Sequence, residues 1–159
     1  MSLLTGLHIP SPVLTTLRIV MGMIFIASGF EKIIDLKFFE LIIAEYQIVP
    51  PALIPAAALS LSLIELLCGI MLVMNLFSRS NAFVLSIITA LFIAGMVNNL
   101  TRDIEHECGC FEFLGQWFGL KEEIGIGAII RDLVFFMLLL LVGLAGSDRI
   151  PWKKPVEPA

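Results

Sequence analysis

Apolar residues dominate four long stretches of the chain, and most charged residues fall in the segments between them. The stretches lie near 12–30, 53–77, 80–99 and 124–146. A helix needs around 20 largely apolar residues to cross a hydrocarbon core of about 30 Å, so each stretch can span a membrane. An open sheet is excluded because lipid cannot satisfy its backbone hydrogen bonds. The pattern predicts an all-α integral membrane four-helix bundle, with residues 1–159 forming a single four-span domain.

Two loops between the predicted spans carry amphipathic segments. Residues 36–49 have the sequence LKFFELIIAEYQIV, and apolar residues around Trp117 in the last loop recur at helical spacing. We expect both segments to be interfacial helices that lie on the membrane surface. Pro50, Pro51 and Pro55 end the first segment and begin the second span.

The composition agrees with a membrane protein and excludes some functions. The chain is 58% hydrophobic and 15% charged, whereas soluble domains have roughly 25% charged residues. Its mean hydropathy is +0.99. A net charge of −4 argues against nucleic acid as a partner, since that would need a basic surface. The N-terminus lacks a basic region and a cleavage site, which predicts an uncleaved first span.

Lysine and arginine placement predicts the orientation in the membrane. With four spans, the termini and the 77–80 turn share one side, which carries a compact basic group: Arg79, Arg149, Lys153 and Lys154. The two long loops on the other side are rich in acidic residues. We therefore expect a multi-pass protein of the bacterial inner membrane with both termini in the cytoplasm and the long loops in the periplasm.

Several charged residues lie within or beside the predicted spans. Lys32 and Asp35 can share one helix face at the membrane surface, or Lys32 simply snorkels to the interface. Glu65 lies well inside the second span, where a carboxylate is costly and needs a partner in the bundle. Depth estimates at 1.5 Å per residue make Arg18 and Arg131 the predicted partners. Such a pair would be structural or would handle protons beneath a redox site.

The last loop contains HECGCFE, residues 106–112, with two of the three cysteines of the chain. Gly109 permits the backbone angles that a disulfide between Cys108 and Cys110 would need. A strained, exposed disulfide is readily reduced, which suits a catalytic bond better than a structural one. His106 would favour a neighbouring thiolate, whereas the adjacent glutamates would disfavour it.

Metal binding is the main alternative for the same loop. His106, Cys108 and Cys110 offer three ligands for Cu(I) or, with a fourth, for Zn. A second series of sulfur atoms recurs at a spacing of three in the second span: Cys68, Met71 and Met74. Such residues are also ordinary fillers of apolar cores. Chemistry alone leaves redox, metal-binding and incidental roles open.

A set of short motifs is spread over nearly the whole chain. They are SGFEKIID after the first span, Phe39, Ile42, Tyr46 and Pro50 in the first loop, Glu65 with Gly69, CGCF before the last span, and Arg131-Asp132 within it. Together they resemble the MauE branch of the DoxX-like membrane proteins. In that family CGCF is followed by glycine, where this chain has Glu112.

The resemblance implies a redox-associated inner-membrane protein. MauE proteins are linked to the maturation of methylamine dehydrogenase, whose small subunit is rich in disulfides, alongside a thioredoxin-like partner. The layout is also similar to the DsbB and VKOR thiol oxidoreductases, which use two cysteine pairs and a quinone. Here one pair plus Cys68 is present.

We therefore expect thiol/disulfide exchange between a periplasm-facing CGC pair and a thioredoxin-like protein or a disulfide-containing client. The predicted site residues are Cys108, Cys110, His106, Lys32, Asp35, Glu65 and Arg131. No cofactor is firmly expected, and a quinone remains open. The alternatives are a soft-metal binding or transport protein that uses His106, Cys108 and Cys110, and a non-catalytic membrane scaffold for enzyme assembly.

Overall fold

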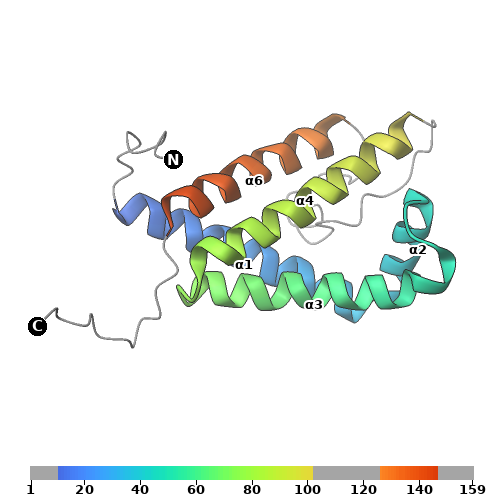
Figure 1. Cartoon of the computed structure of the whole chain (residues 1–159), viewed down its shortest axis with the longest axis horizontal. Coiled ribbons are helices and arrows are strands. Elements are labelled where there is room, and N and C mark those ends of the chain that lie inside the picture. The colour runs from blue at the N-terminus through green and yellow to red at the C-terminus, as the bar shows by residue number, and fades with distance from the viewer. Residues whose placement is uncertain (1–10, 102–125, 147–159) are drawn as a thin grey trace, which may run out of the picture.

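The computed structural model describes residues 11–101 and 126–146 (Figure 1). The elements in these ranges are α1 (Ser11–Ile34), α2 (Leu36–Tyr46), the 3-10 helix η1 (Pro51–Leu53), α3 (Ile54–Val73), α4 (Ser78–Leu100) and α6 (Ile126–Ala145). Within the described residues, α1, α3, α4 and α6 are long and apolar enough to cross a membrane. The predicted all-α membrane bundle is confirmed. The expected helix around Trp117 lies outside the described residues.

The long helices form two closely packed pairs, α1 with α3 and α4 with α6 (Figure 1). A short turn joins α3 to α4, and α2 lies at the other end of the bundle, where α3 begins. There α2 contacts both α3 and α4. This arrangement makes α2 a bridge between the two pairs.

Glycines allow α1 and α3 to approach closely. A Cβ atom added at Gly29 would lie 2.7 Å from the amide nitrogen of Leu66 and 2.9 Å from the carbonyl oxygen of Ser62. A Cβ atom at Gly69 would lie 2.9 Å from the amide nitrogen of Ile26. Small residues commonly permit such backbone contacts between membrane helices. These contacts fix the register of α3 along α1.

The first loop forms α2, as its amphipathic sequence predicts. Asp35 Oδ1 accepts a hydrogen bond of 3.0 Å from the Phe38 amide and so caps the start of the helix. The helix ends at Gln47, which adopts a left-handed conformation with φ of 52°. Pro51 then begins η1, and Pro55 lies in the first turn of α3. The predicted boundary role of the prolines is confirmed.

The placement of α2 differs from the prediction of a helix lying on the membrane. Its apolar face is buried within the protein: Phe39, Ile42, Ile43 and Tyr46. The Tyr46 ring packs directly against Gly95, where an added Cβ atom would come within 2.5 Å of the ring. The side-chain amide of Asn98 also donates to the Tyr46 carbonyl at 2.9 Å. Helix α2 is therefore anchored on α4 rather than resting its apolar face on lipid.

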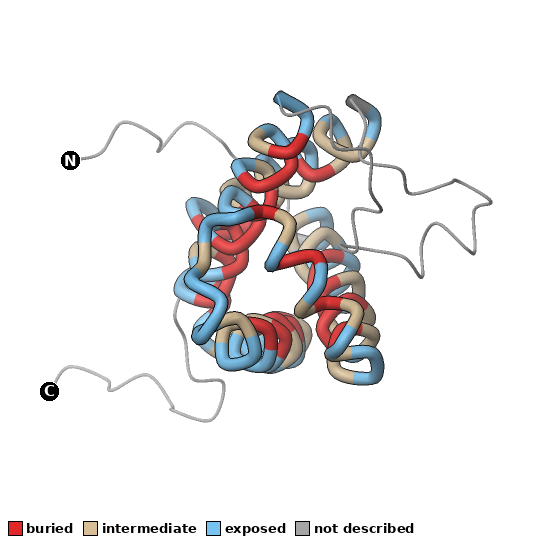
Figure 2. The backbone as a smooth tube through the Cα atoms, turned by 90° about the vertical axis from the view of Figure 1, so that its right-hand side faces the viewer, coloured by how far each residue is buried: buried red, intermediate tan, exposed pale blue. Residues whose placement is uncertain are grey.

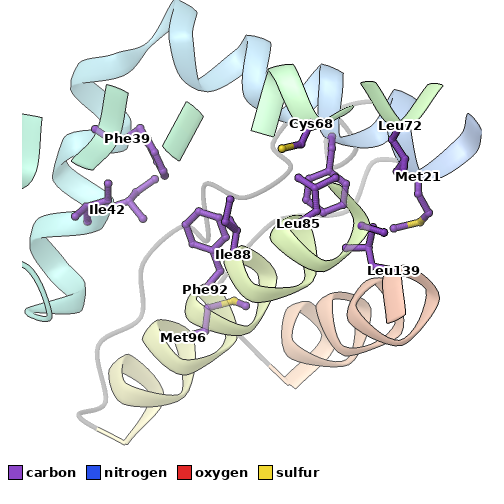
Figure 3. Packing of buried hydrophobic residues seen from close by; sticks show 14 of the residues in the cluster. Met21, Phe39, Ile42, Cys68, Leu72, Leu85, Ile88, Phe92, Met96 and Leu139 are labelled. Carbon is purple, nitrogen blue, oxygen red and sulfur yellow. The ribbon is translucent and has the colours of Figure 1, made fainter. Parts of the chain in front are cut away.

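The buried positions of the helices face the interior of the bundle, and exposed positions cover the outside (Figure 2). Figure 3 shows the core running from Phe39 and Ile42, past Phe92 and Ile88, to Met21, Leu72 and Leu139. Buried hydroxyls of the spans bond to carbonyls of their own helices: Ser62 to Ala58, Ser86 to Phe83 and Thr89 to Leu85. The outward apolar side chains suit a lipid environment.

Candidate functional site

A buried ion pair joins α1 to α3. Lys32 Nζ lies 2.6 Å from Glu65 Oε2, and the two side chains are 3% and 1% exposed. Ser28 Oγ donates a second hydrogen bond of 3.3 Å to the same carboxylate oxygen. A charge buried this deeply in a membrane span is costly unless it is paired. Lys32 is therefore the partner that Glu65 was expected to have.

Two aromatic rings, one from α2 and one from α4, also lie beside the Lys32 ammonium group. Lys32 Nζ lies 5.1 Å from the ring centroid of Phe39 on α2 and 4.5 Å from that of Phe92 on α4. The two rings meet edge to face with centroids 6.1 Å apart. Both distances are within the range of cation–π attraction. Lys32 thus connects α1, α2, α3 and α4 at one point.

The predicted partners of Glu65 are wrong. Arg18 lies fourteen residues before Lys32 on α1, about 21 Å away at 1.5 Å per residue. Arg131 donates from Nε to the neighbouring Asp132 at 3.0 Å. The depth estimate failed because it assumed aligned spans, whereas the glycine contacts place Ser62 and Leu66 of α3 beside Gly29.

Lys32 and Asp35 do not act together at the membrane surface. Lys32 is 4% exposed and points into the bundle, so it neither snorkels nor forms part of the surface. Asp35 is exposed and serves as the N-cap of α2. It follows that Asp35 positions α2, whose Phe39 in turn contacts Lys32.

Among the buried polar residues that were not predicted as site residues, three stand out: Ser28, Asp132 and Asn99. Ser28 contacts Glu65, and Asp132 is 1% exposed beside Arg131. Asn99 on α4 is 0% exposed, and neither atom of its side-chain amide has a hydrogen-bond partner among the described residues. Their positions within apolar spans were the available signal, since polar residues at such depth are often functional.

Cys108, Cys110 and His106 lie outside the described residues. The segment that carries them joins Thr101, at the end of α4, to Ile126, at the start of α6. Both of these anchors lie at the end of the bundle where α2 bridges the pairs (Figure 1). The Lys32–Glu65 pair, near the end of α1, lies toward the same end of the bundle as these two anchors.

The three sulfur-containing residues at the C-terminal end of α3, Cys68, Met71 and Met74, do not line one face of the helix. Cys68 is buried in the core as a free thiol (Figure 3). Met71 and Met74 are 39% and 59% exposed and face outward. In the described parts of the chain, no three His, Cys, Asp or Glu side chains cluster as metal ligands would. The soft-metal alternative for Cys68, Met71 and Met74 therefore gains no support here, and Cys68 packs in the core as the other interpretation expects.

These features define a class of protein: a multi-pass membrane helical bundle with a buried ion pair beneath one of its loop-bearing ends. A family model described as "Methylamine utilisation protein MauE" matches residues 10–145, and the chain belongs to this family. The resemblance to MauE proteins seen in the sequence is confirmed.

One curated relative extends over most of both chains. The methylamine utilization protein MauE of Paracoccus denitrificans is 24% identical over 140 residues, which cover 87% of this chain and 73% of that protein. No solved structure matches the chain.

Proposed function

We propose that this MauE-family membrane protein exchanges thiol and disulfide electrons through Cys108 and Cys110. Its partner would be a periplasmic thioredoxin-like protein or the cysteines of an exported client enzyme during maturation. The observation that carries the proposal is the CGC sequence in a loop anchored at the bundle end that holds the buried ion pair. The name of the relative, a methylamine utilization protein, supports an enzyme of that process as the client in this proposal.

The exchange proceeds in two steps through a mixed disulfide. A thiolate of the pair attacks one sulfur of a partner disulfide, and the partner's other sulfur leaves as a thiolate that takes up a proton. The second cysteine then attacks the mixed disulfide, so the partner gains two electrons and two protons while Cys108 and Cys110 become a disulfide. The reverse sequence would oxidise a client dithiol.

The described site residues act as positioning groups in this proposal. Lys32 and Glu65 hold α1 against α3, and the contacts of Lys32 with Phe39 and Phe92 place α2 and α4 around the same point. Asp35 fixes the start of α2. Arg131 and Asp132 lie in the second turn of α6, close to where the CGC loop returns to the bundle. His106 would favour the thiolate of a neighbouring cysteine.

A redox titration with single-cysteine variants tests the proposal. We expect the purified protein to show a reversible two-electron titration at a potential well above about −300 mV, the range of structural disulfides. Cys108→Ser and Cys110→Ser should each abolish it. Each variant should also trap a mixed disulfide with the partner through its remaining cysteine, because exchange passes through that intermediate.

Cys68→Ser is the matched control, since Cys68 is buried in the core and should leave the titration unchanged. The proposal fails if Cys108 and Cys110 stay reduced under oxidising conditions and hold Cu(I) or Zn together with His106. It also fails if neither variant forms a partner adduct.

The orientation gives a separate prediction. With both termini in the cytoplasm, a membrane-impermeant maleimide added to intact spheroplasts should label Cys108 and Cys110 after mild reduction. Cys68 should remain unlabelled because it is buried between the helices. Labelling that appears only after the inner membrane is opened would place the CGC loop on the cytoplasmic side.

A further inference from the structure

A pocket of about 180 Å³ lies at the end of the bundle opposite the ion pair. It is lined by Leu14, Thr15 and Arg18 of α1, Asn75 and Ser78 at the α3–α4 turn, and Val142, Ala145 and Gly146 at the end of α6. One water occupies roughly 30 Å³ in the liquid, so the pocket has room for a group as large as a phosphate.

Arg18 is the charged side chain among the described residues that line this pocket. Its Nη1 atom is buried and has no hydrogen-bond partner among the described residues. Three carboxylates in the described parts of the chain bind other cations: Glu65 binds Lys32, Glu40 binds Lys37, and Asp132 binds Arg131. A buried polar atom normally has a partner, so an unpartnered guanidinium nitrogen beside a cavity points to an anionic ligand.

The helix ends around the pocket do not reverse this charge. The starts of α1 and α4 each contribute roughly half a positive charge, and the ends of α3 and α6 each contribute roughly half a negative one. These partial charges cancel approximately, which leaves the full charge of Arg18.

Polar donors beside Arg18 fit the oxygens of an anion. Ser78 Oγ donates to Asn75 Oδ1 at 2.6 Å, so the Asn75 Nδ2 group keeps its hydrogens for a ligand. The first amides of α4 are also uncapped by a side chain, because Phe77 precedes the helix. Arginine and amide donors together are typical of phosphate recognition.

We propose that this pocket binds the phosphate group of an anionic phospholipid. A lipid is favoured over free phosphate because apolar side chains adjoin the pocket, where acyl chains would lie. Leu14 and Val142 form part of its wall, and Val13 and Leu144, next to them in sequence, are 54% and 49% exposed. The negatively charged headgroup would pair with the Arg18 guanidinium, whose Nη1 atom has no partner among the described residues.

Native mass spectrometry of the full chain, purified in detergent, tests the proposal with added phosphatidylglycerol, phosphatidylcholine or inorganic phosphate. The protein should bind phosphatidylglycerol more tightly than the other two. Arg18→Gln should weaken that binding by about tenfold or more, since it removes a charge-assisted contact. Arg18→Lys should have an intermediate effect because it keeps the charge but loses the planar donor set.

Two further variants distinguish binding in this pocket from general surface attraction and from a failure of Arg18→Gln to fold. Arg79→Gln removes the same charge at the same end, but the Arg79 guanidinium lies over the Phe83 ring, so binding should be nearly unchanged. Ala145→Phe should fill the pocket and abolish binding while Arg18 remains, which provides a test even if Arg18→Gln does not fold. Equal losses for Arg18→Gln and Arg79→Gln would show general surface attraction and overturn the proposal. Equal binding of phosphatidylcholine, or equally tight binding of inorganic phosphate, would overturn the assignment to an anionic lipid.

Discussion

Replacing Lys32 by methionine is expected to lower the free energy of unfolding by about 3–5 kcal/mol, the cost typical of breaking a buried ion pair. The substitution leaves the Glu65 carboxylate, 1% exposed, without its cation and with a hydrogen bond from the Ser28 hydroxyl. It also removes the cation from its contacts with Phe39 and Phe92. Denaturant-induced unfolding in mild detergent would measure the loss.

The exposed pair of Lys37 and Glu40 provides the control. Lys37 is 86% exposed and lies 2.9 Å from Glu40, so Lys37→Met should change stability by less than about 1 kcal/mol. Combining Lys32→Met with Glu65→Leu removes both charges and should restore much of the stability lost in the single variant. Equal stabilities for the Lys32 and Lys37 variants would show that the buried pair does not hold α1 against α3.

Valine at Gly29 is expected to cost about 3 kcal/mol, near the upper end for overpacking a well-packed core. Its Cβ atom would lie within 3 Å of the backbone of both Ser62 and Leu66, and backbone atoms cannot move aside as a flexible side chain can. The helices must separate instead. That separation also stretches the Lys32–Glu65 pair, one turn further along α1. Thermal unfolding of the purified protein would report the effect.

Gly127 is the matched control because an added Cβ atom there meets nothing within 4 Å. Gly127→Val should leave the midpoint of unfolding nearly unchanged. If Gly29→Val and Gly127→Val had the same midpoint of unfolding, close packing of α1 against α3 would not be a source of stability.

The sequence was sufficient to predict the spans because each needs only a long apolar run, a property of local composition. Helix α2 was also predictable, since Asp35 and the prolines mark its limits. Its burial was not, because an amphipathic helix presents the same pattern to lipid and to a protein groove.

The partner of Glu65 could not be predicted from depth alone. Lys32 was placed at the surface because the first apolar run was taken to end near residue 30, whereas α1 continues to Ile34. The register between α1 and α3 depends on contacts at Gly29 and Gly69, which a count of residues from the membrane surface does not include. The CGC pair lies outside the described residues and stays a prediction from the sequence.

The distance in sequence between Lys32 and Glu65 has a consequence for how the chain is made. The two residues are 33 positions apart, so Lys32 leaves the ribosome before its carboxylate partner exists. At about 5–20 residues per second, the gap lasts roughly 2–7 s. During that time α1 carries an unneutralised ammonium group that α3 must later cover. Stable integration of the first span therefore depends on the arrival of the second.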